Sequence, residues 1–377
     1  MTVTFFSNFL LHHQTPFCEA MVKSLGDGFR FVATEQIPED RLSLGYRDLS
    51  HETDYAINSY ESPEAYEQSL SLGAESDVVI IGSAPDVFIE ERLKHNKLTF
   101  RYHERYFREG RWRILDPRVF ISHYKKDFRY RNKPLYMLCA SAYTAPDCRF
   151  IGCYKNKTFK WGYFPPVLRY EKIDDVIEQK EPNSILWVAR FLKLKHPEAA
   201  IYVAKKLKSD GYKFTLNIIG RGELEDKIKR MITDNGFQNE VHLLGSMSPE
   251  EVRTQMEKSE VFLFTSDRNE GWGAVLNESM NSACAVVANG SIGSVPYLIK
   301  DGENGLVYKN GNFEELYSKV KYLMDNAPER KKMAKNAYET LVSTWNADVA
   351  ASRLLKLIEC IKNGKDTPFT DGPCSKD

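Results

Sequence analysis

The chain has 377 residues, 42% of them hydrophobic, with 52 lysines and arginines against 52 aspartates and glutamates. This length suffices for two domains with packed cores, and the balanced total charge by itself gives no indication of a nucleic-acid partner. The seven cysteines include no C-x-x-C pair, and their odd number without a framework pattern predicts reduced thiols in the cytoplasm. Neither a signal peptide nor an apolar run of about 18 residues is visible.

Short apolar runs alternate with helical patterns through the N-terminal half. The runs that predict strands lie at 3–6, 29–33, 77–81 and 98–103, and a further apolar segment lies at 135–142. The helical patterns lie at 16–25, 62–72 and 87–94, the first of them opened by Pro16. This alternation predicts a doubly wound parallel sheet in an α/β domain that covers residues 1–166.

Two strand ends in this half carry histidines. His12 and His13 lie in the loop after the first predicted strand, at the edge where ligands bind in open α/β sheets. The strand at 98–103 ends with His103, and Glu104 follows it. We interpret all four as candidates for contact with a substrate. Solvated, helix-capping or purely structural histidines are the alternative.

A second series of strands and helices fills the C-terminal half. Residues 167–182 are proline-containing and charged, which predicts an interdomain linker. A second α/β domain is expected over 183–345, with buried strands at 184–188, 214–220, 241–244, 261–264 and 283–288. An amphipathic helix at 346–362, expected to return to the first domain, and a disordered tail at 363–377 complete the chain.

The segment Val261–Asn289 reads as strand, loop, helix and strand. Glu270 lies at the mouth of the loop and Glu278 about two turns into the helix, which gives the spacing E-x7-E. Carboxylates accept hydrogen bonds from sugar hydroxyls, and the amides of Gly271–Val275 open the helix at its positive end, where a phosphate binds well. The segment therefore suits a sugar, a phosphate and a ribose. The alternative is that Glu270 only stabilises the helix dipole and that Glu278 is a solvated residue on the helix.

Two cations follow the first strand of the second domain. Arg190 comes directly after Ala189, and Lys195 follows five residues later. A leaving nucleoside diphosphate gains negative charge in the transition state, so two fixed cations at a strand end would stabilise it. A surface pair without a ligand is the alternative.

These motifs form one series over Asn183–Val307. The residues E-G-W-G-A-V-L-N-E at 270–278 resemble the E-x7-E motif of the retaining nucleotide-sugar glycosyltransferases of glycosyltransferase family 4, also called glycosyl transferases group 1. A-R-x4-K at 189–195 resembles the family's G-R-x4-K, and G-Y-F-P-P at 162–166 resembles an element of its polysaccharide-cluster members. Ala189 and Tyr297 stand where many relatives have Gly and Glu.

The resemblance implies a GT-B fold, in which two Rossmann-like doubly wound domains face each other across a cleft. It implies catalytic roles for His103, Glu270, Arg190 and Lys195, and leaves His12, His13 and Glu104 to bind the acceptor. The donor contacts that it implies are Arg190, Lys195, Gly220, Glu270, Gly271, Trp272, Gly273, Ala274, Val275 and Glu278.

The same resemblance implies transfer of a sugar from a nucleotide diphosphate sugar, with retention of anomeric configuration, in polysaccharide or glycan biosynthesis. The acceptor would be a saccharide or a lipid-linked saccharide, and UDP, GDP and ADP sugars all fit the donor motifs. We expect no cofactor and no metal site, because Arg190, Lys195 and the helix amides would replace the charge of a metal. A nucleotide-sugar 2-epimerase of the same fold and a non-catalytic sugar-binding subunit are the alternatives.

Charge is distributed unevenly along the N-terminal half. Residues 35–91 hold 14 acidic and 2 basic side chains, whereas residues 92–133 hold 14 basic and 4 acidic ones. The basic stretch is also aromatic, with Trp112, Phe120 and Tyr124 among its members, which is typical of a surface that rests on anionic lipid. We therefore expect a cytoplasmic enzyme, peripheral on the inner face of the membrane, with no nucleic-acid partner. Internal pairing of the two stretches is the alternative.

Overall fold

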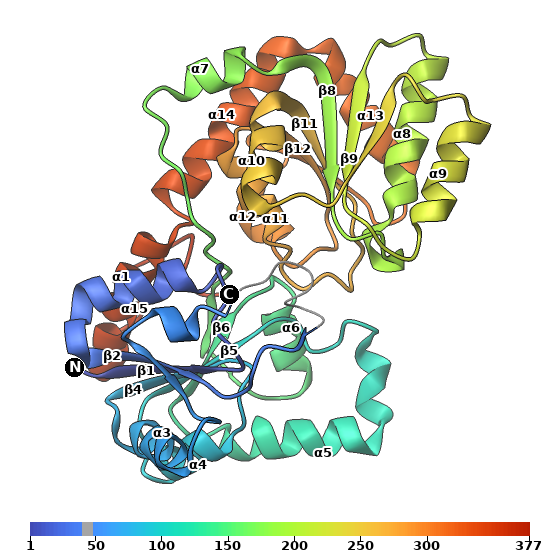
Figure 1. Cartoon of the computed structure of the whole chain (residues 1–377). Coiled ribbons are helices and arrows are strands. Elements are labelled where there is room, and N and C mark those ends of the chain that lie inside the picture. Colours follow the sequence, from blue (N-terminus) through green and yellow to red (C-terminus); the bar gives the residue numbers. More distant parts are fainter. Residues whose placement is uncertain (40–47) are drawn as a thin grey trace. The chain divides into compact units, whose positions relative to one another are not determined.

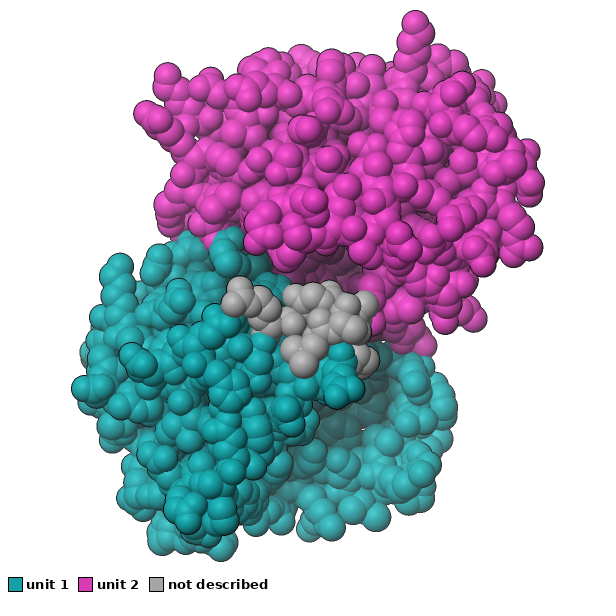
Figure 2. Space-filling view, viewed as in Figure 1, with its two compact units in different colours: residues 1–166, 345–377 teal, residues 167–344 magenta. Residues whose placement is uncertain are grey.

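The computed structural model describes residues 1–39 and 48–377, so part of the acidic stretch lies outside the described residues. The chain divides into two compact units, which Figure 2 shows in different colours. Unit 1 comprises Met1–Pro166 together with Trp345–Asp377, and unit 2 comprises Val167–Thr344.

Unit 1 is built on a parallel sheet with the strand order β3-β2-β1-β4-β5-β6-β7. Its strands are β1 (Val3–Ser7), β2 (Phe29–Ala33), β3 (Ala56–Asn58), β4 (Val78–Ile81), β5 (Thr99–His103), β6 (Leu135–Cys139) and β7 (Thr158–Lys160). The helices of this unit are α1 (Thr15–Leu25), α3 (Pro63–Glu75), α4 (Val87–Lys94), α5 (Pro117–Lys126), α6 (Thr144–Phe150) and α15 (Ala347–Lys362). The expected doubly wound parallel sheet is therefore present.

Alternation along β1 explains why this sheet carries helices on both faces (Figure 1). Phe5 meets Phe17 of α1 edge-on, with the ring centroids 6.2 Å apart. Its neighbour Phe6 points to the opposite face and stacks on Phe88 of α4, with the centroids 5.0 Å apart. Because successive side chains of a strand point to opposite faces, a fully apolar strand such as β1 requires a helical layer on each side.

The end of the chain is packed, and the expectation of a disordered tail at 363–377 is wrong. Lys376 forms an antiparallel bridge with Phe159 of β7, and the backbone N–H of Lys160 donates to the Ser375 carbonyl at 2.8 Å. Cys374 is fully buried. The segment covers the edge of the sheet at β7, which would otherwise leave unpaired backbone groups.

Unit 2 has a second parallel sheet, with the strand order β10-β9-β8-β11-β12-β13. Its strands are β8 (Glu181–Val188), β9 (Thr215–Ile219), β10 (Val241–Gly245), β11 (Ser259–Phe264), β12 (Ala285–Asn289) and β13 (Leu306–Tyr308). Its helices are α7 (Ile173–Glu178), α8 (Pro197–Ser209), α9 (Glu225–Asp234), α10 (Pro249–Lys258), α11 (Val275–Asn281), α12 (Val295–Leu298), α13 (Phe313–Asp325) and α14 (Ala327–Ser343).

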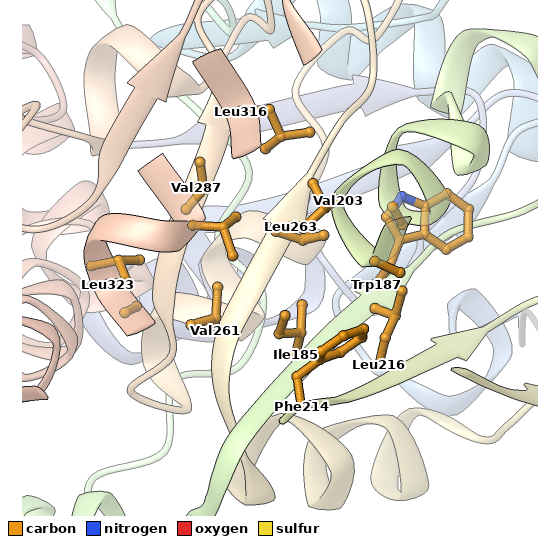
Figure 3. Packing of buried hydrophobic residues seen from close by; sticks show 14 of the residues in the cluster. Ile185, Trp187, Val203, Phe214, Leu216, Val261, Leu263, Val287, Leu316 and Leu323 are labelled. Carbon is orange, nitrogen blue, oxygen red and sulfur yellow. The ribbon is translucent and has the colours of Figure 1, made fainter. Parts of the chain in front are cut away.

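The core of unit 2 follows the two-residue period of its strands. Ile185 and Trp187 of β8 point to the same face as Val261 and Leu263 of β11, and the helices α8 and α13 cover that face (Figure 3). All four side chains are at most 1% exposed. The burial of this continuous apolar layer fixes the register of β8 against β11, and with it the position of the loops that follow both strands.

Both sheets contain a point where the direction of strand addition reverses. In unit 2 this point lies between β8 and β11, and in unit 1 it lies between β1 and β4. In open α/β sheets the loops that leave the carboxyl ends of two such strands diverge and leave room for a ligand. The four loops at these two points are therefore the first places to look for a site.

Candidate active site

In unit 2, hydrogen bonds hold the loop after β8 against the loop after β11. The Trp187 indole N–H donates to the Thr265 hydroxyl at 2.7 Å, and that hydroxyl donates to the Lys195 carbonyl at 2.6 Å. The backbone N–H of Asp267 donates to the Leu194 carbonyl at 2.8 Å. Because Trp187 belongs to the buried layer, the core of the unit positions both loops.

The functional groups of the two loops meet directly. The Lys195 ammonium is hydrogen-bonded to the Glu270 carboxylate, and both side chains are mostly buried, with 16% and 14% exposure. Arg190 is exposed and lies three residues before η5 (Lys193–Lys195). The structure thus brings together Lys195 and Glu270, two groups that were expected to contact the diphosphate and the sugar, although 75 residues separate them in sequence.

Two glycines permit the close approach of backbone around this pair. Gly220 has φ +133°, and a Cβ there would lie 1.9 Å from the Ala189 carbonyl oxygen. Gly273 has φ +76°, and a Cβ there would lie 2.4 Å from Cζ of Phe264. Both positions combine a backbone conformation that favours glycine with a lack of space for a side chain. Gly220 therefore supports the loop that carries Arg190.

Helix α11 carries the second glutamate and begins at Val275, with Ala274 as its N-cap residue. Burial raises the pKa of the Glu278 carboxyl to about 7, and the nearby charge of Arg253 opposes this shift only in part. A carboxyl group with this pKa changes its protonation state near neutral pH and responds to any ligand that donates hydrogen bonds to it.

Trp272 has its side chain in the core, which limits the donor contact expected of it. The indole is fully buried, and its N–H donates to the Asn277 side-chain oxygen at 2.8 Å. The Ser294 hydroxyl donates to the Trp272 carbonyl at 2.6 Å. Trp272 therefore anchors this loop through its buried ring and these two hydrogen bonds, and the preceding residue, Gly271, is buried as well.

The structure adds His196 to the groups at this edge, where sequence reasoning assigned it no role. Its Nδ1 lies 2.9 Å from Oε1 of Glu198, and its Nε2 lies 3.3 Å from Oδ2 of Asp267. The hydrogen bond with Glu198, followed by that with Asp267, raises the pKa of His196 although burial opposes the change. His196 has φ +50°, a conformation that is uncommon outside glycine.

In unit 1, a polar cavity of about 340 Å³, here called pocket 1, lies at the reversal point between β1 and β4. The His13 ring stacks on Tyr163 at a centroid distance of 4.7 Å, and the Tyr163 hydroxyl donates to Glu104 at 2.7 Å. His13, Glu104 and Tyr163 all line the cavity. His12 is exposed and does not line it, although the edge of its ring meets His13.

His103 lies at the boundary of two cavities. It lines pocket 1 and also a second cavity of about 470 Å³, here called pocket 2. Its Nδ1 lies 2.6 Å from the Glu104 carbonyl oxygen. Since a carbonyl only accepts, Nδ1 carries the proton and Nε2 of the neutral ring is left as an acceptor. Burial lowers the pKa of His103 to about 4, so the ring is neutral at physiological pH.

A buried network that sequence reasoning missed supports pocket 2. The Arg101 guanidinium donates to both oxygens of Asp86, at 3.0 and 3.2 Å. Asp127 accepts from the Tyr154 hydroxyl at 2.7 Å and lies 3.1 Å from Nδ1 of His123. Burial disfavours the charge of Asp127, but the hydrogen bonds from His123 and Tyr154 and the charge of Arg101 keep the pKa of its carboxyl below the usual value.

Residues 169–340, which lie within unit 2, match the family model described as glycosyl transferases group 1. An uncharacterized glycosyltransferase of Methanocaldococcus jannaschii is 31% identical over 157 residues, which are 42% of this chain and 42% of its own length. The amylovoran biosynthesis glycosyltransferase AmsK of Erwinia amylovora is 28% identical over 193 residues, which are 50% of this chain and 47% of its own length. The chain thus spans about half the length of the curated relatives that it matches.

Solved structures resemble the chain over almost its whole length. HepE of Anabaena in complex with UDP gives a TM-score of 0.72 at 13% identity and covers 95% of this chain and 100% of its own. The lipopolysaccharide outer core galactosyltransferase WaaB gives a TM-score of 0.70 at 16% identity, and the match covers 96% of this chain and 100% of WaaB. At these identities the likeness shows the fold alone, which is the two-domain Rossmann-like fold of GT-B glycosyltransferases.

Proposed function

We propose that this protein is a group 1 glycosyltransferase that moves a sugar from a nucleotide diphosphate sugar to an acceptor in polysaccharide or glycan biosynthesis. The observation that carries the proposal is the contact of Lys195 with Glu270 at the reversal point of unit 2, inside the segment that matches the family model. In this function a cation and a sugar-binding carboxylate have to lie next to one another, because the diphosphate and the sugar are covalently joined.

The side chains of the donor site bind different parts of the nucleotide sugar. Lys195 and Arg190 bind the diphosphate and stabilise the charge that it gains as it leaves. Glu270 accepts hydrogen bonds from sugar hydroxyls, and Glu278 accepts them from the ribose. The backbone of Gly271–Val275 holds phosphate oxygens at the start of α11. Two fixed cations make a divalent metal unnecessary, and the sugar is transferred with retention of configuration.

The acceptor site lies in pocket 1. A sugar ring packs against the stacked pair of His13 and Tyr163, and its hydroxyls donate to Glu104. His103 offers its Nε2 as an acceptor to the sugar that reacts. The acceptor is a saccharide or a lipid-linked saccharide, and we place the enzyme on the cytoplasmic side of the membrane.

Calorimetric titration with UDP, GDP and ADP, each beside its nucleoside, tests the assignment of the donor site. Lys195→Ala should weaken the preferred diphosphate by roughly 10- to 150-fold and leave the nucleoside almost unchanged, since a charge-assisted contact is lost. Glu270→Ala should instead strengthen binding of the diphosphate, because Lys195 then interacts with it without competition from a carboxylate.

Lys331→Ala, on the surface of α14, serves as the control and should bind like the wild type. Equal weakening of diphosphate and nucleoside by Lys195→Ala would indicate damage to the fold. A loss of diphosphate affinity in Glu270→Ala would show that the two side chains do not share a ligand in the proposed way.

A further inference from the structure

Helix α5 of unit 1 turns its apolar face toward solvent. Pro117, Phe120, Ile121 and Tyr124 follow the i, i+3, i+4, i+7 spacing that places residues on one face of a helix. Phe120 is 57% exposed, Ile121 49% and Tyr124 51%, and no residue of α5 is buried. A surface helix ordinarily buries such a stripe in its own domain, so an exposed one indicates a partner.

The apolar face continues into the turn that precedes the helix. In η3 (Arg111–Leu115), Trp112 is 61% exposed and Leu115 is 81% exposed. An apolar hollow of about 290 Å³ opens beside Phe120 and Tyr124. These exposed side chains lie within one segment of 13 residues, Trp112–Tyr124, at the periphery of unit 1 (Figure 1).

The positive charge of α5 indicates an anionic partner. The helix carries Arg118, Lys125 and Lys126 and no carboxylate. At 100° per residue, Arg118 and Lys125 lie beside the apolar face. Some cations of this stretch are neutralised internally. Arg129 pairs with Glu90 at 2.8 Å, and Arg118 of α5 itself pairs with Asp116 at 3.1 Å, whereas Lys125 and Lys126 form no ion pair within the described ranges. Basic residues that flank an exposed apolar face complement an anionic lipid surface.

The opposite face of α5 lines pocket 2. Ser122, His123 and Lys126 contribute to that cavity, next to His103. These three residues lie on the side of the helix away from Ile121 and Tyr124. One short helix therefore separates a polar cavity from an exposed apolar face.

We propose that α5 and η3 bind the protein to an anionic phospholipid bilayer, with Phe120, Ile121 and Tyr124 at the boundary between headgroups and acyl chains. Lys125 then lies at the level of the lipid phosphates. Pocket 2 then lies on the far side of α5 from the bilayer, and it shares His103 with pocket 1, where the head of a lipid-linked acceptor would bind. This last step rests on the proposed function, whereas binding to lipid does not.

Tryptophan fluorescence measures this contact in the full chain. Trp112 is the exposed tryptophan among the five, all of which the structure describes, and the other four are at most 3% exposed. Vesicles of phosphatidylcholine and phosphatidylglycerol in equal parts should shift the emission to the blue, and co-sedimentation at low salt should show binding. Vesicles of phosphatidylcholine alone should do neither, and high salt should reverse the binding.

The double variant Phe120→Ser, Ile121→Ser separates insertion from simple charge attraction, because it leaves the net charge unchanged. It should weaken vesicle binding by about tenfold or more. Tyr322→Ser is the matched control, since Tyr322 is a similarly exposed aromatic residue, 44% exposed, on α13 of unit 2. The control should bind vesicles like the wild type, and all variants should show the far-ultraviolet circular dichroism of the wild type.

Three results would overturn the proposal. The first is an absence of wild-type binding to the anionic vesicles at low salt. The second is unchanged binding by the Phe120→Ser, Ile121→Ser variant, which would leave the exposed face without a role. The third is self-association of the wild type that the double variant abolishes, which would identify the face as an interface between copies of the chain. Because no donor or acceptor is used, none of these results depends on the proposed function.

Discussion

At the residue scale, the contact between Lys195 and Glu270 determines how the donor site would respond to its ligand. Each side chain is mostly buried, so each would lack a counter-ion if the other were absent. A diphosphate that binds Lys195 replaces one anion by another, and Glu270 becomes available to sugar hydroxyls. In the proposed function the pair would couple binding of the phosphates to release of the carboxylate that contacts the sugar.

Glu278 gives the donor site a pH dependence. The pKa of its carboxyl is about 7 against an ordinary value of 4.5. In the proposed donor site, ribose hydroxyls would donate to the ionised form, so affinity for a nucleotide sugar should rise by up to tenfold per pH unit below pH 7 and level off above it. Because the raised pKa belongs to the folded state, the same shift should lower the free energy of unfolding as the pH rises from 4.5 to about 7.

Calorimetric titration of a nucleotide sugar across this pH range measures the effect, since the diester phosphates of such a ligand do not titrate there. Glu278→Gln should bind with nearly constant affinity. A wild-type affinity that does not change with pH, or a slope that persists in Glu278→Gln, would show that the ribose is not bound by this carboxylate.

The candidate residues differ in how far the sequence could place them. Lys195 and Glu270 each belong to a motif after a predicted buried strand, and the contact follows because β8 and β11 are neighbours in the sheet. His13 and His12 could not be distinguished, because only the stack on Tyr163 directs one of them into the pocket. The network of Arg101, Asp86 and Asp127 depends on tertiary contacts that no spacing in the chain indicates.

At the scale of elements, one buried lysine joins several segments of unit 2. The Lys180 ammonium donates to the carbonyls of Met256, Glu257, Ser259 and Ser282, at 2.9 to 3.0 Å. These four carbonyls lie at the end of α10, the start of β11 and the residue after α11. Lys180 precedes β8 by one residue, so it fixes where the first strand of this unit begins.

Lys180→Met should lower the free energy of unfolding by roughly 2–4 kcal/mol, because four carbonyls, three of them in buried hydrogen bonds, lose their charged donor. Urea unfolding followed by tryptophan fluorescence measures the change. Lys331→Met removes an exposed pair with Glu178 and should cost no more than about 1 kcal/mol. Comparable effects of the two substitutions would contradict the structural role of Lys180.

Elements with a clear apolar run or helical period could be predicted from the sequence, whereas the shortest strands, and the helices α13 and α14, carried no expectation. Helices α1, α3 and α4 lie within three residues of their expected ends, since each shows a clear helical period or an opening proline. The strands β3, β7 and β13 have only three residues each, which is too short for a recognisable apolar run. The order of the terminal segment depends on its pairing with β7, a contact across more than 200 residues of chain.

At the scale of the whole molecule, each unit places a polar site at the reversal point of its own sheet. Unit 2 presents a cation and two carboxylates, which suit a nucleotide sugar, and unit 1 presents an aromatic and acidic pocket, which suits a saccharide. Among the described residues, no helix is both long enough and apolar enough to cross a membrane. Unit 1 also has the exposed apolar face of α5, which is distinct from pocket 1.

We propose that the protein transfers a sugar from a nucleotide sugar without a metal. The most direct test is to incubate the purified full chain with a panel of UDP, GDP and ADP sugars in excess EDTA and to follow release of nucleoside diphosphate by phosphorus NMR. We predict slow release from one preferred donor, faster release with a saccharide acceptor, a product that retains the anomeric configuration, and near-complete loss in Glu270→Ala. The absence of release from every donor, reversible inversion at C2, or activity that appears only with added Mg²⁺ or Mn²⁺ would contradict the claim.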